Sequence, residues 1–280
     1  MMQDKIIVKA PAKINLFLHV LNKREDGYHN IRTGITFINL YDEVNIKKNN
    51  VMSIKYFGNF MPSSGSYEDC IITRILKFLE VKVNLNISIK KNIPVQAGLG
   101  SASTNAATLI KGLERLKIIK SIDNYKSYSF LGADIPVFLY GKDSFVQGKG
   151  EIITDHYFPK YFFLLVKPKI NISTKQMYKK ISKNILNVNK SKIIKKNFIT
   201  KDDYVNDFES IAIKENDEIN NLLKFLSNSE GCIFARMTGS GSCCFGAFEK
   251  IKFANKSQIK LRDNFPKLWS FVGENNTIKN

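Results

Sequence analysis

A glycine-rich stretch in the first half of the chain has the residue types of a phosphate-binding loop. It reads Pro94-Val95-Gln96-Ala97-Gly98-Leu99-Gly100-Ser101-Ala102-Ser103 and runs into a segment where Ala106, Leu109 and Leu113 recur at helical spacing. Such a loop exposes backbone N–H groups at the positive end of a helix dipole, and the two together attract an anion. The stretch therefore predicts a site for a phosphorylated ligand.

Three common nucleotide-binding motifs do not account for this loop. The Walker A pattern, which ends in Gly-Lys-Ser or Gly-Lys-Thr, has no match in the sequence. The dinucleotide pattern of three glycines fails because its last position here is Ser103. The protein-kinase motifs fail as well, because Asn206-Asp207-Phe208-Glu209 is not Asp-Phe-Gly and no His-Arg-Asp occurs. We interpret the Asn206 block as structural, at the start of a helix.

Three polar side chains near the expected elements are candidates for chemistry. Lys13 and Asn15 share one face of an expected strand, because side chains alternate along a strand. Asp134 lies in Gly-Ala-Asp-Ile-Pro, where Pro136 disfavours helical backbone angles at Ile135. We therefore expect a bend that displays the Asp134 carboxylate.

The strand that carries Lys13 belongs to a predicted hairpin. Apolar and polar residues alternate over 14–20 and again over 31–37, which predicts two strands that each bury one face. The turn residues Asp26 and Gly27 separate them. This arrangement places Tyr28 and His29 near the tip of the hairpin.

The remaining pattern predicts a second group of elements. We expect a short helix over 71–79, a strand over 83–89, a helix from Ser103, and an apolar strand at 161–166 that opens a second domain. The glycine-rich Met237–Ser242 segment is followed by a strand through Phe248. Within it, we expect Gly239–Ser242 to brace the phosphate-binding loop rather than to touch the substrate.

Composition bounds the class of protein. The 280 residues exceed the ~150 of one typical domain, and 44% hydrophobic residues suffice for a sizeable core. The formal charge of +18 favours an anionic partner, although AT-rich codon usage would also enrich lysine. The lysine-rich stretch 179–201 is interpreted as a solvated segment rather than a nucleic-acid patch.

Cysteines, histidines and apolar runs argue for a cytoplasmic location. No C-x-x-C pair occurs, so we expect reduced thiols, and the scattered histidines predict no metal site in the protein itself. The apolar run at 161–166 is far shorter than the ~20 residues of a membrane span, and no secretory leader is visible. The cysteines and histidines are Cys70, Cys232, Cys243, Cys244, His19, His29 and His156.

Three separated blocks resemble the GHMP kinase superfamily. They are Pro-Ala-Lys-Ile-Asn-Leu at 11–16, the glycine-rich stretch and its continuation at 94–107, and Thr-Gly-Ser-Gly-Ser at 238–242. The resemblance implies an α+β fold of two domains: a ribosomal protein S5 domain 2-like N-terminal domain over 1–157 and a ferredoxin-like C-terminal domain over 158–280. It also implies ATP as co-substrate with Mg²⁺, and an active site in the cleft between the domains.

The same resemblance assigns roles to residues. Lys13 and Asp134 correspond to the catalytic pair of the superfamily, which aligns a hydroxyl with the γ-phosphate of ATP. The hydroxyls of Ser101, Ser103 and Thr104 are candidates to contact phosphate or Mg²⁺. The ATP-binding residues that it implies are Pro94, Val95, Gln96, Ala97, Gly98, Leu99, Gly100, Ser101, Ala102, Ser103 and Thr104.

Three further blocks, at 26–29, 132–136 and 148–151, resemble the members that phosphorylate an alcohol joined to cytidine diphosphate in isoprenoid precursor synthesis. Tyr28 and Tyr178 then correspond to aromatic residues that sandwich the cytosine, His29 to a hydrogen-bond partner of the base, and Asn15 to a substrate contact. The loop departs from the usual pattern at Ser101-Ala102, where two glycines are expected and added Cβ atoms would restrict the backbone.

Two alternatives stay open at this point. Another small-molecule kinase of the superfamily would act on mevalonate, homoserine or a sugar. An S5-like nucleic-acid-binding module is the alternative from a different class, motivated by the charge of +18. We favour the kinase of a cytidine diphosphate substrate over the other kinases, because those have no reason to place Asp-Gly-Tyr-His at 26–29 beside the first block. We expect no nucleic-acid or membrane partner, because the lysines are not interleaved with aromatic residues. A monomer and a homodimer are equally compatible with the sequence.

Overall fold

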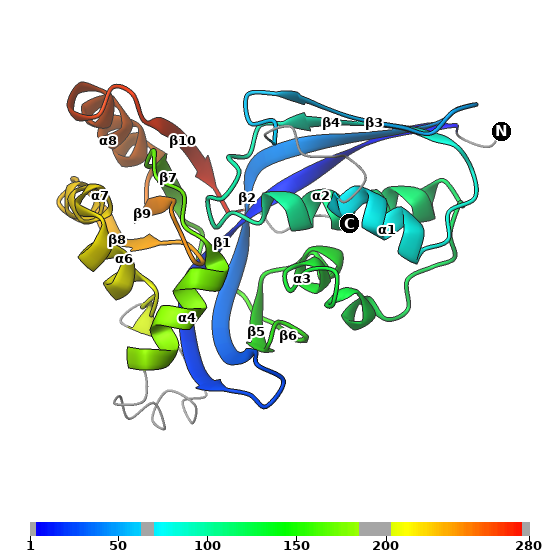
Figure 1. The fold of residues 1–280 in the computed structure, drawn as a ribbon. Coiled ribbons are helices and arrows are strands. Elements are labelled where there is room, and N and C mark those ends of the chain that lie inside the picture. Colours follow the sequence, from blue (N-terminus) through cyan, green and yellow to red (C-terminus); the bar gives the residue numbers. More distant parts are fainter. Residues whose placement is uncertain (1–3, 63–69, 185–202, 276–280) are drawn as a thin grey trace.

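Two β-sheets, each covered by helices, make up the fold (Figure 1). The computed structural model describes residues 4–62, 70–184 and 203–275. Within this part, a six-stranded sheet forms the N-terminal domain and a four-stranded sheet forms the C-terminal domain. The expected two-domain α+β architecture is confirmed. Most of the lysine-rich stretch, residues 185–201, lies outside the described residues.

The N-terminal sheet is built around the predicted hairpin. β1 and β2 pair antiparallel, from Lys5 opposite Lys47 to Lys23 opposite His29, with the turn at Asp26-Gly27. The strand order is β3-β4-β2-β5-β6, and β1 pairs with β2 off this path. The strands are β1 (Lys5–Lys23), β2 (His29–Lys48), β3 (Ser53–Gly58), β4 (Leu85–Lys91), β5 (Ser144–Gly148) and β6 (Ile152–Asp155).

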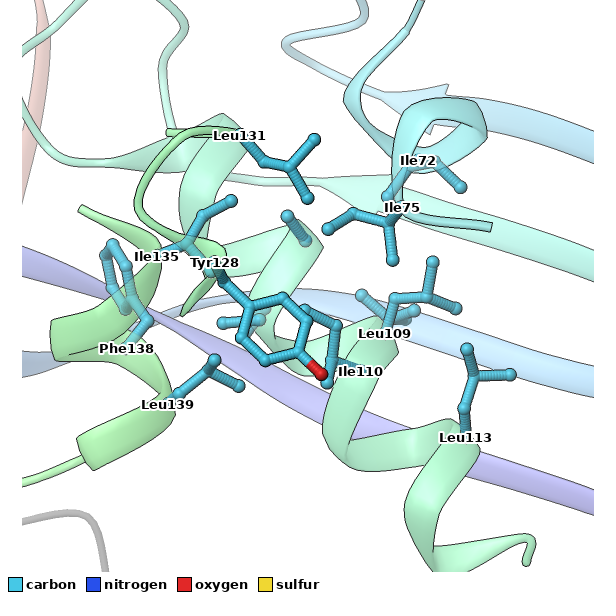
Figure 2. Close-up of a cluster of buried hydrophobic side chains, with 14 of the residues drawn as sticks. Ile72, Ile75, Leu109, Ile110, Leu113, Tyr128, Leu131, Ile135, Phe138 and Leu139 are labelled. Carbon is cyan, nitrogen blue, oxygen red and sulfur yellow. The ribbon is translucent and has the colours of Figure 1, made fainter. Parts of the chain in front are cut away.

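Three helices cover one face of this sheet. α2 (Ser101–Arg115) is amphipathic and buries Leu109, Ile110 and Leu113 toward the sheet and its neighbours. α1 (Ile71–Phe78) and α3 (Ile135–Tyr140) pack beside it. Figure 2 shows how these side chains meet Ile72, Ile75, Tyr128, Leu131, Ile135, Phe138 and Leu139. This cluster fixes the position of the N-terminus of α2.

The segment that carries Asp134 is a helix start rather than an isolated bend. Asp134 is the N-cap of α3 and Ile135 is its first residue, so the prediction that Ile135 avoids helical angles is wrong. Pro136 is the second residue of the helix, where a backbone N–H has no partner in the helix and a proline is tolerated. The Asp134 side chain is 39% exposed, so it is displayed as expected.

The C-terminal sheet has the order β10-β7-β9-β8, and all its strand pairs are antiparallel. The chain order β-α-β-β-α-β is the ferredoxin-like motif. The elements are β7 (Phe162–Lys167), α4 (Thr174–Asn184), α6 (Glu209–Glu215), α7 (Asp217–Ser227), β8 (Cys232–Met237), β9 (Cys244–Phe248), α8 (Ile251–Asn264) and β10 (Trp269–Glu274).

β1 is buried on both faces in its central part. The alternation at 14–20 predicts one buried face, but every residue from Ala10 to Val20 is buried. The second face is covered because β1 contributes to all three hydrophobic clusters. Ala10 belongs to the cluster under α2, Ile14 and Phe17 to the one between the sheets, and Val20 to the one under the C-terminal helices. We propose that the boundary between the two domains lies at residue 157. Side chains of β1, in the N-terminal domain, nevertheless pack in the same clusters as side chains of the C-terminal domain.

No helix in the described ranges is long and apolar enough to cross a membrane. All four cysteines lie in those ranges and are free.

A buried carboxylate in the N-terminal domain leads to a prediction about stability. Asp143 is 7% exposed and accepts a 2.9 Å hydrogen bond from the Thr36 hydroxyl. Burial raises the pKa of Asp143 from its usual 3.8 to about 6. The folded protein therefore binds more protons than the unfolded chain between these values, and the stability contribution of Asp143 falls as the pH rises through this window.

We expect the free energy of unfolding of the wild type, relative to Asp143→Asn, to fall by about 3 kcal/mol between pH 3 and pH 7. Urea unfolding of both proteins across this range measures the difference. Other acidic groups titrate equally in both proteins and cancel. A difference that stays constant with pH would contradict the prediction.

Candidate active site

A cavity of about 1230 Å³ opens between the two domains. Its lining comes from β1, the N-termini of α2 and α3, the segment before α4, and the turn after β8. Single-ligand pockets usually measure about 300–1,000 Å³, so this cavity has room for two ligands. Four lysines and one carboxylate, among the described residues, line it: Lys13, Lys91, Lys149, Lys175 and Asp134. This surplus of positive charge suits phosphorylated ligands.

The phosphate-binding loop is held between the two domains. The backbone N–H of Lys13 donates to the Leu99 carbonyl at 3.1 Å, and that of Cys243 donates to the Ala97 carbonyl at 3.3 Å. Gly98 has φ +71°, and a Cβ built on it would lie 2.2 Å from the Thr238 carbonyl oxygen. Only glycine satisfies both conditions. Thr238 and Cys243, on either side of the segment 239–242 predicted to brace the loop, make these contacts, while Gly239, Ser240 and Gly241 also line the cavity.

The loop delivers the N-terminus of α2 to the cavity. Gly100 is the N-cap with φ +74°, and no side-chain cap or acidic first-turn residue occupies this end of the helix in the described structure. The helix begins at Ser101, two residues before the predicted start. Ser101 and Ala102 are therefore helical and need no glycine, so their departure from the usual loop does not restrict the backbone as expected.

Nine of the eleven predicted ATP-binding residues line the cavity, and two do not. Leu99 and Thr104 are 1% and 0% exposed and lie outside the lining formed by the described residues. The Ser101 hydroxyl is engaged by the Lys91 ammonium group, and its oxygen also lies 3.4 Å from the Ile93 carbonyl. Of the three residues with predicted hydroxyl contacts, Ser101 and Ser103 line the cavity. Ser101 is buried, whereas Ser103 is half-buried.

A buried ion pair under the loop was not predicted. Asp42 is 0% exposed and pairs with Lys91, which is 3% exposed. Its other carboxylate oxygen accepts the backbone N–H groups of Asn92 and Ile93 at 2.7 and 2.8 Å. Burial lowers the pKa of Lys91, although the Asp42 charge opposes this shift. The pair ties the start of the loop to β2, but 49 residues separate its members and no local pattern relates them.

The structure brings the predicted catalytic pair together. The Lys13 ammonium group lies 3.6 Å from the Asp134 carboxylate, although β1 and α3 are far apart in sequence. Lys13 is 4% exposed and also donates to the Asn15 side-chain oxygen. The Asn15 amide donates to the Thr33 hydroxyl at 2.8 Å. This chain of contacts fixes the position of the Lys13 ammonium group beside the phosphate-binding loop.

The two predicted aromatic residues, Tyr28 and Tyr178, have different surroundings in the structure. Tyr178 lines the cavity, and its ring stacks on His29 with centroids 5.2 Å apart and an interplanar angle of 26°. Tyr28 is 57% exposed, and its ring lies 5.2 Å from the Lys149 ammonium group. Its backbone N–H is held at the turn by Asp26 at 3.1 Å. Tyr28 is not part of the cavity lining formed by the described residues, and the sandwich of the base between Tyr28 and Tyr178 stays a prediction.

Burial and nearby charges set the protonation of these groups. Burial and the neighbouring Lys23 lower the pKa of His29 below its usual 6.5, so the ring is neutral at pH 7. Burial and the Asp134 carboxylate raise the pKa of Tyr178, so its hydroxyl stays protonated. A neutral imidazole and a phenol suit the recognition of an uncharged base.

Known GHMP kinases are similar to this chain in sequence over most of its length. The profile of the GHMP kinases N terminal domain matches residues 70–142, and that of the GHMP kinases C terminal region matches residues 192–261. A 4-diphosphocytidyl-2-C-methyl-D-erythritol kinase of Prochlorococcus marinus is 37% identical over 278 residues, covering 90% of this chain and 88% of the relative. The chain belongs to the GHMP kinase family. A second relative of that name, from Francisella tularensis subsp. novicida, is 37% identical with 84% of each chain covered.

Solved structures of the GHMP kinase family share the fold. A crystal structure of 4-(cytidine 5'-diphospho)-2C-methyl-D-erythritol kinase matches with TM-score 0.76 at 24% identity, covering 97% of this chain and all of that one. The Methanococcus jannaschii mevalonate kinase matches with TM-score 0.65 at 17% identity, covering 97% and 98%. At these identities the structural matches establish the fold, while the sequence relatives establish the family.

Proposed function

We propose that this GHMP kinase transfers the γ-phosphate of ATP to the 2-hydroxyl of 4-diphosphocytidyl-2-C-methyl-D-erythritol, in the non-mevalonate isoprenoid precursor pathway. The name of the relatives at 37% identity supports this substrate. The observation that carries the chemistry is the Lys13–Asp134 contact of 3.6 Å. It lies in one cavity that also contains the N-terminus of α2 and Tyr178.

The proposed mechanism assigns one task to each group. The Asp134 carboxylate orients the acceptor hydroxyl and accepts its proton. The Lys13 ammonium group holds the same hydroxyl and offsets the negative charge that spreads over the transferring phosphoryl group. The N–H groups of residues 98–103 bind the phosphates of ATP at the positive end of α2. Alignment of hydroxyl and phosphate supplies most of the effect, because a carboxylate is a weak base.

Recognition of the cytidine group is assigned to the other end of the cavity. We propose that Tyr178 stacks on the cytosine, that His29 hydrogen-bonds the base, and that Tyr28 closes over it. Asn15 contacts the alcohol while it holds Lys13. This requires His29 to leave the face of Tyr178 on which it now stacks. Lys149, which contacts the ring of Tyr28, lines the cavity there and suits the diphosphate.

Mg²⁺ is proposed to enter with ATP rather than to reside in the protein. The described residues contain no group of three or more His, Cys, Asp or Glu side chains suited to a metal. Ser103 lines the cavity and fits as one oxygen ligand. Mg²⁺ usually takes its remaining ligands from phosphate and water. We also propose a cytoplasmic location, in keeping with four free cysteines.

Coupled ADP release tests the proposed substrate. We expect turnover with 4-diphosphocytidyl-2-C-methyl-D-erythritol and at least 100-fold lower kcat/KM with mevalonate, homoserine and galactose, because they lack a base for Tyr178 to stack on. Comparable turnover with one of these alcohols would keep the kinase but overturn the substrate. Inactivity with all four alcohols, together with salt-dependent RNA binding, would favour the nucleic-acid module instead.

A further inference from the structure

The Asn206–Glu209 block joins parts of the molecule that the proposed mechanism uses separately. The segment runs beside β1, where Leu18 forms a parallel bridge with Asn206. Leu18 donates its N–H to Val205 and accepts the N–H of Asp207, both at 2.9 Å. Next in the chain, Phe208 lines the cavity and packs edge-on against Tyr178 with centroids 4.9 Å apart. The block therefore contacts both the strand that carries Lys13 and the cavity wall assigned to the cytosine.

The Asn206 side chain uses each of its hydrogen-bonding groups inside the protein. It is 2% exposed, and its amide nitrogen donates to the carbonyls of Met237 at 2.6 Å and Gly239 at 2.8 Å. Its side-chain oxygen accepts the backbone N–H of Phe208 at 3.0 Å. An aspartate has the same shape but cannot donate to two carbonyls. This geometry therefore requires an amide.

The turn held by Asn206 is the one that braces the phosphate-binding loop. Between the two carbonyls lies Thr238, whose hydroxyl accepts the Asn15 backbone N–H at 2.9 Å and donates to the Gly98 carbonyl at 3.4 Å. A Cβ built on Gly239 would lie 3.2 Å from both the Asn15 side-chain oxygen and the Gly98 carbonyl. Gly239 therefore lies close to both Gly98 and Asn15, and we expect movement of the turn to displace both residues.

We propose that Asn206 is a positioning residue for phosphoryl transfer. It holds the 237–241 turn at the distance at which Thr238 fixes the phosphate-binding loop and the strand that carries Lys13. Asn206 does not touch ATP in this proposal, and it acts through Thr238. The proposal rests on the proposed kinase function, but its effect on nucleotide binding can be measured without the alcohol.

A merely structural role for Asn206 is the alternative, and Asn275 provides a matched control. Asn275 is 9% exposed and, like Asn206, bonds to backbone groups: it accepts the Tyr161 N–H at 2.7 Å and donates to the Pro159 carbonyl at 3.1 Å. It makes two such bonds where Asn206 makes three. It is not part of the cavity lining formed by the described residues. Loss of either side chain removes comparable buried hydrogen bonds and lowers stability.

The test compares Asn206→Asp, Asn206→Ala and Asn275→Ala by calorimetric binding of ATP, thermal unfolding and steady-state kinetics. We expect both Asn206 variants to bind ATP at least 10-fold more weakly and to lose at least 10-fold in kcat. We expect Asn275→Ala to unfold at a similarly reduced temperature but to bind ATP within twofold of wild type. ATP binding within twofold of wild type in the Asn206 variants would overturn the proposal.

Thr238→Val keeps the proposal testable if the Asn206 variants do not fold. Valine has the shape of threonine but lacks the hydroxyl that bonds to the Asn15 N–H and the Gly98 carbonyl. We expect the same loss of ATP affinity, and unchanged affinity would overturn the proposal. If the Asn206 variants lose ATP affinity while wild type phosphorylates none of the alcohols, the proposed substrate fails and the positioning role stands.

Discussion

Asp134→Asn is expected to lower kcat by about 10² to 10⁴, with ATP affinity within twofold of wild type. Asparagine keeps the shape of the side chain but cannot accept a proton, and it loses its charge interaction with Lys13 at 3.6 Å. The phosphate-binding loop does not depend on Asp134 for its hydrogen bonds, since the backbone of Lys13 and Cys243 holds it. Single-turnover phosphoryl transfer and calorimetric ATP binding measure the two effects separately.

A matched ion pair on the surface serves as the control. Asp155 lies 3.8 Å from Lys142, is 65% exposed and also accepts a hydrogen bond from the Tyr140 hydroxyl, so Asp155→Asn removes an exposed ion pair outside the cavity lining formed by the described residues. Lys13→Met should match Asp134→Asn, and the double variant should be little worse than either single one, because the two residues act as a unit. Independent losses that multiply in the double variant would contradict this coupling.

Gly98→Ala is expected to weaken ATP binding by at least 10-fold and to cost about 1–3 kcal/mol of stability. The added Cβ would lie 2.2 Å from the Thr238 carbonyl oxygen, and a backbone atom cannot rotate away as a side chain can. The loop must then move away from the turn after β8, which withdraws its N–H groups from the phosphates. Calorimetric ATP binding and urea unfolding measure the two losses.

Gly27→Ala is the control that separates the two effects expected of Gly98→Ala, the close contact of the added Cβ and the unfavourable backbone conformation. Gly27 has φ +82°, similar to that of Gly98, but no atom lies within 4 Å of a Cβ built there. We expect a comparable conformational cost of about 1–2 kcal/mol and ATP affinity within twofold of wild type. If both variants lose ATP affinity equally, the contact with Thr238 is not the reason.

Local patterns predicted the positions of the catalytic groups better than their surroundings. Glycines before an amphipathic segment gave the loop and α2, and the alternation around Lys13 gave β1. The contact between Lys13 and Asp134 rested on resemblance, because nothing in their spacing brings β1 and α3 together. The resemblance to the GHMP kinase family is confirmed by the relatives at 37% identity.

Features that depend on tertiary packing were missed for a physical reason. The second buried face of β1 exists because distant elements cover it, among them Phe163 and Phe245 of the other sheet. The buried charge of Asp42 is satisfied by Lys91, 49 residues away. The ring of Tyr28 contacts Lys149, which comes from the loop after β5. Each feature joins segments whose local patterns are unrelated.

Because three hydrophobic clusters enclose β1, the nascent chain cannot complete its folding until the later members of these clusters have been synthesised. Phe245, which packs in the same cluster as Phe17, is made 228 residues later. At about 5–20 residues per second, the first strand waits roughly 10 to 45 s for this cover. During that interval the Ala10–Val20 part of β1, which the folded protein buries on both faces, has one uncovered face. An uncovered apolar strand associates readily with other chains, so the yield of folded protein depends on the length of this interval as well as on the stability of the finished enzyme.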